Sequence, residues 1–186
     1  MDQNTQNPPS TPAPAPQEPV KIGITLPTNA YFMSGIRDFT LSMIKNMTQF
    51  SEQWAYRFQS VVDELCNNAI EHGSARGHDI MVTFIQNPQD QSIEIIVDDS
   101  GTGKDKITAA LLKGIVEERT KPEYSFKSIR GRGLAKIVSA WSDELEFTDL
   151  PNGGIRTRVK KYLNNPALQQ AVPGVSVDPT HVLLTI

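Results

Sequence analysis

The chain has 186 residues, a hydrophobic fraction of 38% and a formal net charge of -3 at pH 7. This length favours one domain with an ordinary hydrophobic core. The slightly acidic balance gives no overall reason to expect direct binding to nucleic acid or to an anionic membrane, because such partners select for basic residues. The single cysteine, Cys66, excludes an intramolecular disulfide framework, and no apolar stretch is long enough to predict a membrane span. We therefore expect a cytoplasmic protein.

Composition divides the chain into three parts. Residues 1–20 are rich in Pro, Gln, Asn, Ser and Thr, and they offer too few apolar side chains to offset the entropy of ordering, so we expect a disordered leader. Residues 21–163 carry regular apolar patterns and form the predicted domain. Residues 164–186 are an extension interrupted by prolines, and its apolar end, residues 182–186, either docks as a strand or stays mobile.

The first half of the predicted domain contains a strand and two helices. Residues 21–26 alternate as in a strand, and residues 27–29 form a turn. The apolar stripe of the first helix consists of Ile36, Phe39, Met43, Ile44 and Met47. Ser51 is the predicted N-cap of a second helix, and Gly73 is placed to end it. The apolar face of this second helix consists of Trp54, Phe58, Val61, Val62, Leu65, Cys66 and Ala69.

A predicted hairpin follows the second helix. Residues 79–86 and 92–97 are rich in Ile, Val, Met and Phe, and the segment between them, Asn-Pro-Gln-Asp, is typical of a turn. From residue 104 to residue 130 the periodicity weakens. We predict a mobile connection there, in which residues 107–116 can form a helix.

The end of the domain combines a helix and a second hairpin. Residues 133–142 resume the helical pattern, and residues 144–148 and 155–162 flank a Pro-Asn-Gly-Gly turn. Helices and mostly antiparallel strands thus occur in segregated runs. The predicted class is α+β, with a mixed, mostly antiparallel sheet and helices on one face.

Polar side chains mark the end of the second predicted helix. Glu64 and Asn68 lie four residues apart, which places both on one helix face, where they can share a ligand. An Asn carbonyl oxygen suits Mg2+, and a nearby carboxylate can deprotonate an attacking hydroxyl. The alternative is that these residues, with Asn67 and Glu71, are the solvated side of an amphipathic helix.

A glycine-rich turn, Asp99-Ser100-Gly101-Thr102-Gly103, follows the strand at residues 92–97. An aspartate at the end of a strand can accept a hydrogen bond from an exocyclic amine such as that of adenine. Gly101 and Gly103 would let the backbone approach a ring or a ribose. The alternative is a simple turn, which Asp and Gly favour in any protein.

A second glycine pair, Gly131 and Gly133, opens the last helical pattern. Free N–H groups and the positive end of the dipole at a helix N-terminus suit phosphate, whereas the alternative is a glycine-rich loop without a ligand. The basic residues nearby are Lys127, Arg130, Arg132 and Lys136. They fit a polyphosphate, or they form a solvated basic face.

Two residues beside the first motif complete the candidate list. Cys66 lies on the apolar side of its helix, so we expect a buried small hydrophobe rather than a nucleophile. His72, next to Gly73, is expected at a helix end, from which it could reach a phosphate. The fixed order of the three motifs and the setting of each point to one ATP site.

On these residues the chain resembles the GHKL (Bergerat) ATP-binding domain shared by gyrase, histidine kinases and mismatch-repair ATPases. Within that group it is similar to the bacterial anti-sigma factor serine/threonine kinases. The resemblance covers residues 21–163. It is strongest over residues 62–73, and segments 26–29 and 120–123 also resemble the family's opening segment and its ATP lid.

The resemblance implies a two-layer α/β sandwich and a role for each motif. Glu64 would be the catalytic base that activates a serine, and Asn68 would bind Mg2+. Asp99 would bind the adenine amine, in a pocket shaped by Gly101 and Gly103. The second glycine box beside the phosphates would consist of Gly131, Arg132, Gly133 and Leu134.

One position departs from the family pattern. The last strand of these domains often offers a Gly-Thr pair near adenine, whereas here Gly154 is followed by Ile155. Thr157 comes two residues later on the same face of the strand and is therefore a candidate site residue.

The resemblance also implies cofactors and partners. The cofactors would be ATP and Mg2+, and the substrate would be a serine or threonine of an anti-anti-sigma (STAS-domain) protein. The kinase would act as a homodimer and sequester a sigma factor until that protein displaces it. The alternative is a regulatory binding module in which ATP sets conformation and partner affinity without phosphoryl transfer.

Overall fold

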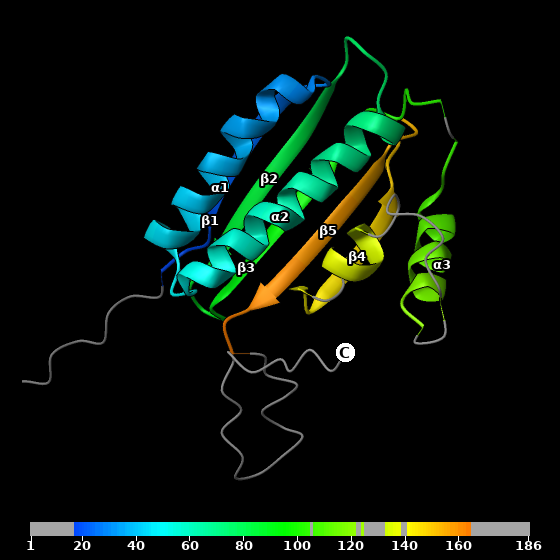
Figure 1. The fold of residues 1–186 in the computed structure, drawn as a ribbon. Coiled ribbons are helices and arrows are strands. Elements are labelled where there is room, and N and C mark those ends of the chain that lie inside the picture. Colours follow the sequence, from blue (N-terminus) through cyan, green and yellow to red (C-terminus); the bar gives the residue numbers. More distant parts are fainter. Residues whose placement is uncertain (1–16, 105, 122–123, 125–132, 139–140, 165–186) are drawn as a thin grey trace, which may run out of the picture.

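The computed structural model describes residues 17–104, 106–121, 124, 133–138 and 141–164. These residues form a five-stranded sheet in the order β1-β2-β3-β5-β4, with helices α1 and α2 packed on one face (Figure 1). Every strand pair of the described chain is antiparallel. The two-layer α+β architecture is as predicted, and the sheet is antiparallel throughout its described strands where a mixed sheet was expected. The predicted leader up to residue 16 and the extension from residue 165 lie outside the described residues.

The first half of the fold follows the predicted order. Its elements are β1 (Val20–Pro27), the short helix η1 (Ala30–Phe32), α1 (Met33–Met47), α2 (Glu52–Asn68) and the π-helical turn η2 (Ala69–Gly73). The predicted cap is confirmed, because the Ser51 side chain accepts a hydrogen bond from the backbone N–H of Trp54. Gly73 is the last residue of η2, as expected for the end of the helical segment.

The second half contains two hairpins and a helix between them. Its elements are β2 (Asp79–Asn87), β3 (Ser92–Asp98), α3 (Ala109–Arg119), the π-helical turn η3 (Gly133–Val138), β4 (Glu144–Asp149) and β5 (Ile155–Tyr162). Both predicted hairpins are confirmed by antiparallel pairing of β2 with β3 and of β4 with β5. Within the predicted helix at 133–142, residues 133–138 are a π-helical turn.

Helix α3 is displaced from its predicted bounds of 107–116. It begins at Ala109 because the Thr108 side chain caps it by accepting a hydrogen bond from the Leu111 N–H. The Ala109 N–H also donates to Asp149 Oδ1 over 2.8 Å. This second bond ties the start of α3 to the end of β4, and the two elements lie side by side in Figure 1.

The hydrophobic core lies between the two helices and the sheet. Phe39 of α1 meets Phe84 of β2 edge to face, with ring centroids 5.2 Å apart. Val62 and Cys66 of α2 are fully buried against the sheet. Burial raises the pKa of the Cys66 thiol to about 12, so this cysteine behaves as a small hydrophobe, as the sequence predicts.

The opposite face of the sheet is polar and carries cross-strand ion pairs. Arg158 of β5 bonds to Glu94 of β3 at 2.7 Å and to Glu144 of β4 at 2.9 Å. Arg156 forms a bidentate pair with Asp98, with both distances at 2.7 Å. No helix of the described chain covers this face, which is consistent with its charged side chains on β3, β4 and β5.

A glycine in the middle of α3 gives the first prediction. A Cβ added at Gly114 would meet nothing within 4 Å, so Gly114→Ala is expected to raise the free energy of unfolding by roughly 0.5 to 1 kcal/mol through the greater helix propensity of alanine. Urea unfolding followed by circular dichroism measures this. Gly101→Ala is the opposite control, because Gly101 has a φ of +67° and its added Cβ would lie 2.3 Å from Gly154 N. A loss of stability in Gly114→Ala would contradict the assignment of α3 as a regular helix.

Candidate functional site

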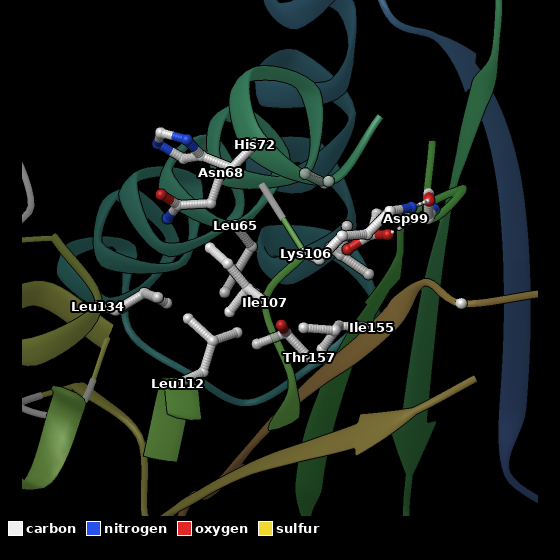
Figure 2. A pocket seen from close by; sticks show the side chains of 15 residues that line it. Leu65, Asn68, His72, Asp99, Lys106, Ile107, Leu112, Leu134, Ile155 and Thr157 are labelled. Atoms are coloured by element: carbon white, nitrogen blue, oxygen red, sulfur yellow. Dashed lines mark hydrogen bonds between the residues drawn. The ribbon is translucent and has the colours of Figure 1, made fainter. Parts of the chain in front are cut away.

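A cavity opens where the end of α2, turn η2, the loop after β3 and strand β5 meet. Its walls are mainly apolar side chains, namely Leu65, Val97, Ile107, Leu112, Leu134 and Ile155. Polar side chains also line it, namely Asn68, His72, Asp99, Lys106 and Thr157. Figure 2 shows Asn68 and His72 on one side of this cavity and Asp99 on the other, with apolar side chains between them. We call it the first cavity.

Asp99 supplies the carboxylate of the first cavity. Strand β3 ends at Asp98, and the Asp99 N–H donates to Ile155 O over 3.1 Å, which ties this loop to β5. The Gly101 N–H donates to Asp99 Oδ1 over 2.8 Å and fixes the carboxyl group. Burial raises the pKa of Asp99, against the opposing effect of the backbone hydrogen bonds from Gly101 and Ile155. A partly buried carboxylate in an apolar cavity is a strong acceptor for an N–H donor.

The glycines around Asp99 permit close contact between three loops. A Cβ at Gly73 would lie 2.3 Å from Asp99 Cγ, and one at Gly103 would lie 1.8 Å from His72 O. Gly101 is similarly pressed against the Gly153–Gly154 backbone. The sequence predicts that Gly101 and Gly103 shape a ligand pocket. The structure adds that these glycines let the loops pack against each other, which in turn fixes Asp99.

A second cavity adjoins the first and shares part of its wall. The residues that line both are Asn68, His72, Ile107, Leu112 and Leu134. Those that line only the second are Glu64, Asn67, Glu71, Ile115, Val116, Arg119, Gly133 and Ala135. Asn68 and His72 therefore stand at the junction, with Asp99 in one cavity and Glu64 in the other.

Glu64 and Asn68 are bonded to each other, as their helical spacing predicts. Asn68 Nδ2 donates to Glu64 Oε1 and to the Glu64 backbone carbonyl, both over 2.8 Å. Because the amide nitrogen makes these bonds, the amide oxygen is the atom that Asn68 can offer to a cation or a donor. The pair thus combines a carboxylate oriented by a hydrogen bond with a neutral oxygen ligand.

Gly133 lies against the Glu64 side chain. A Cβ added at Gly133 would lie 1.8 Å from Glu64 Cδ, so only glycine fits this contact without a shift. Leu134, the next residue, lines both cavities. The second glycine motif is therefore brought to the first motif in space. Gly131 and Arg132 lie outside the described residues, as do Lys127 and Arg130.

Several lining residues were not identified from the sequence. Ile107 and Leu112 come from the weakly periodic segment before and within α3, and Lys106 Nζ donates to Gly101 O over 3.1 Å. Arg119 is the last residue of α3. Thr157, a candidate from the sequence, lines the first cavity and pairs with Val97 across β3 and β5. The apolar spacing of Leu112, Ile115 and Val116 was the available signal for the α3 wall.

The described residues contain no group of three or more His, Cys, Asp or Glu side chains that could hold a metal ion. None of the helices in this part of the chain has the length and apolarity needed to cross a membrane.

The comparison with protein families agrees with this arrangement. The model of the histidine kinase-like ATPase domain matches residues 26–161. The match spans both cavities and most of the chain, so the protein belongs to the histidine kinase-like (GHKL-type) ATPase domain family. The antiparallel α+β fold is consistent with that family, and the chain is an ATP-binding module of this type. No curated protein matched the chain.

The contact between Gly133 and Glu64 gives a prediction that a double-mutant cycle can test. Gly133→Ala is expected to cost about 0.5 to 1.5 kcal/mol of stability, because the Glu64 carboxyl group must turn away from the added methyl group and give up its hydrogen bond from Asn68. In a Glu64→Ala background the same substitution should cost less, since the overlapping atoms are gone. Urea unfolding of the four proteins measures the coupling. Equal costs in both backgrounds would show that Gly133 does not touch Glu64 in solution.

Proposed function

We propose that this chain is a Mg-ATP-dependent protein serine/threonine kinase. The observation that carries the proposal is the placement of Glu64 in a cavity that adjoins the Asp99 cavity through Asn68. ATP binding requires an adenine pocket and a phosphate site, but it does not require an additional carboxylate in the cavity next to them. Glu64 is suited to receive a proton there.

The residues of the two cavities fit the parts of ATP. The Asp99 carboxylate matches the exocyclic amine of adenine, and the apolar walls of the first cavity match the ring. Gly101 and Thr157 line the same cavity, and Gly103 would shape it through its contact with the His72 backbone. Asn68 would offer its oxygen to Mg2+, whose remaining ligands would be phosphate oxygens and water. Bound Mg-ATP would supply an activated phosphoryl group.

The phosphate end would lie at the junction and in the second cavity. His72 lines both cavities and is a candidate phosphate contact. Gly133 and Leu134 line the second, and we assign Gly131 and Arg132 to the same glycine box by the motif alone. Backbone N–H groups of a glycine-rich segment are suitable donors for phosphate oxygens.

Glu64 would act as the general base of the reaction. Its carboxylate would accept the proton of a serine or threonine hydroxyl of the substrate protein as that oxygen attacks the terminal phosphorus of ATP, whose bond to the bridging oxygen breaks to release ADP. The hydrogen bond from Asn68 to Glu64 Oε1 orients the carboxylate for this role. Because Asn68 would also bind the metal, the base and the metal site would be held together by one helical turn.

The resemblance to anti-sigma factor kinases supports a more specific proposal. The substrate would be a serine or threonine of an anti-anti-sigma (STAS-domain) protein, and the chain would sequester a sigma factor, as a homodimer, in a partner switch. The supporting residues are those of segment 62–73, which contains Glu64 and Asn68. The match of the family model over residues 26–161 supports the ATP-binding domain alone.

A second function deserves a test because Glu64 is packed against Gly133. A carboxylate held by the chain's own backbone and by Asn68 is also what a purely structural role would require. In that case the protein would be a regulatory module whose partner affinity depends on ATP, without phosphoryl transfer.

The adenine assignment predicts a loss of ATP binding in Asp99→Ala. Calorimetric titration of ATP into the unmodified protein should show binding that is stronger with Mg2+ than without it. Removing the carboxylate is expected to weaken binding by about tenfold to a hundredfold, the range for a hydrogen bond to a charged group. Thr102→Ala, in the same loop but outside both cavities, is the matched control. Unchanged affinity in Asp99→Ala would refute the assignment of Asp99.

The kinase proposal predicts a slow Glu64→Gln variant. With radiolabelled ATP and the anti-anti-sigma proteins of the source organism as substrates, the rate of transfer should fall by about 10²- to 10⁴-fold, the usual contribution of a general base. ATP affinity should be retained. Glu71→Gln, which removes the same charge from the same cavity, should transfer at the parent rate. Transfer at the parent rate in Glu64→Gln would exclude the base role, and no transfer by the parent protein would favour the regulatory module.

A further inference from the structure

One face of helix α3 lines the second cavity. The residues of α3 that line this cavity are Leu112, Ile115, Val116 and Arg119. Their spacing of three and four residues places them on one helix face. Because the start of α3 is capped by Thr108 and bonded to Asp149, the helix is anchored at β4, and its last turn forms part of the cavity wall.

Arg119 gives this wall its fixed positive charge. Among the described residues that line the second cavity, Arg119 is the only lysine or arginine, and two carboxylates, Glu64 and Glu71, line the same cavity. Arg119 is partly buried. It ends α3, where a cation is favoured by the negative end of the helix dipole. The sequence places it directly before the segment at residues 120–123.

We propose that Arg119 recognises the terminal phosphate of bound ATP, and that it thereby makes the site select ATP over ADP. This inference rests on the proposed function. Adenine, ribose and the inner phosphates are common to both nucleotides, so a residue at the adenine end cannot distinguish them. The phosphate to be transferred must come within reach of Glu64, and Arg119 lines that same cavity.

The chemistry of the guanidinium group supports this role. Its planar array of donors can form two parallel hydrogen bonds to a phosphate, and its charge does not depend on pH in the working range. ADP lacks the third phosphate, so Arg119 would make no such contact when ADP is bound. Because Arg119 is on α3, the anchored helix would then respond to whether the nucleotide is ATP or ADP.

The test is the ratio of ATP to ADP affinity, measured by calorimetry with Mg2+. In Arg119→Ala the affinity for ATP should fall by about tenfold to a hundredfold, and the affinity for ADP should stay unchanged. Arg119→Lys should lie between the parent and Arg119→Ala, since lysine keeps the charge but cannot form two parallel bonds. Lys113→Ala is the matched control, because Lys113 is an exposed α3 cation that lines neither cavity.

Several results would overturn the inference. An equal fall in ATP and ADP affinity would show that Arg119 acts on α3 or on a shared part of the nucleotide. An unchanged ratio, or a ratio near one in the parent protein, would show that Arg119 does not read the third phosphate, while the nucleotide site itself would stand. If the parent protein bound neither nucleotide, the proposed function would fail together with this inference. Retained ADP affinity in each variant confirms that it is folded.

Discussion

The packing of α2 against the sheet is the constraint on which both cavities depend. Val62 and Cys66 are fully buried, and Leu65 is 2% exposed while it also lines the first cavity. Successive residues of a helix are separated by about 100° around its axis, so a change of one residue in the buried face would turn Glu64 away from its cavity. The hydrophobic core therefore sets the direction of the catalytic candidates.

The loops around Asp99 depend on a second kind of constraint, the close approach of backbone segments. The contact of Gly73 with Asp99 and that of Gly103 with His72 bring η2 and the loop after β3 together, and the Gly103 N–H donates to Gly73 O over 3.2 Å. The bond from Asp99 N to Ile155 O adds β5. Three segments that are distant in sequence thus hold one carboxylate. In this region, glycine acts through the absence of a side chain more than through unusual backbone angles, because only Gly101 of these residues has a positive φ.

The sequence predicted the elements with strong periodicity and missed those positioned by tertiary contacts. The buried face of α2, its Ser51 cap and the hairpin of β2 and β3 all follow from local patterns. The start of α3 does not, because it depends partly on a bond to Asp149, 40 residues away. The α3 residues that line the second cavity were not identified for the same reason. The apolar residues among them show a weak pattern, and no local rule indicates that Arg119 shares a cavity with Glu64.

The strand order and the second glycine motif show the same limit. A local pattern cannot place β5 between β3 and β4, an order that is stabilised by the bonds of Arg158 to Glu94 and Glu144 on either side. Nor can it show that Gly133 rests on Glu64. The sequence indicated a phosphate loop at this glycine, and its contact with Glu64 of α2, five elements earlier in the chain, became visible only in the fold.

The segment that contains Gly133 is attached to α2 at two places. Gly133 contacts Glu64. Eight residues later, the ring of Trp141 lies near the Arg57 guanidinium, whose Cζ is 5.9 Å from the ring centroid. Arg57 also lies over the ring of the buried Trp54, 4.6 Å from its centroid. Arg57 and Glu64 are seven residues apart, which is two helical turns, and they therefore lie along one side of α2. The contact of Glu64 with Gly133 and that of Arg57 with Trp141 therefore both tie this part of the chain to the same side of α2, so the helix that sets the direction of Glu64 also helps to set the position of Gly133.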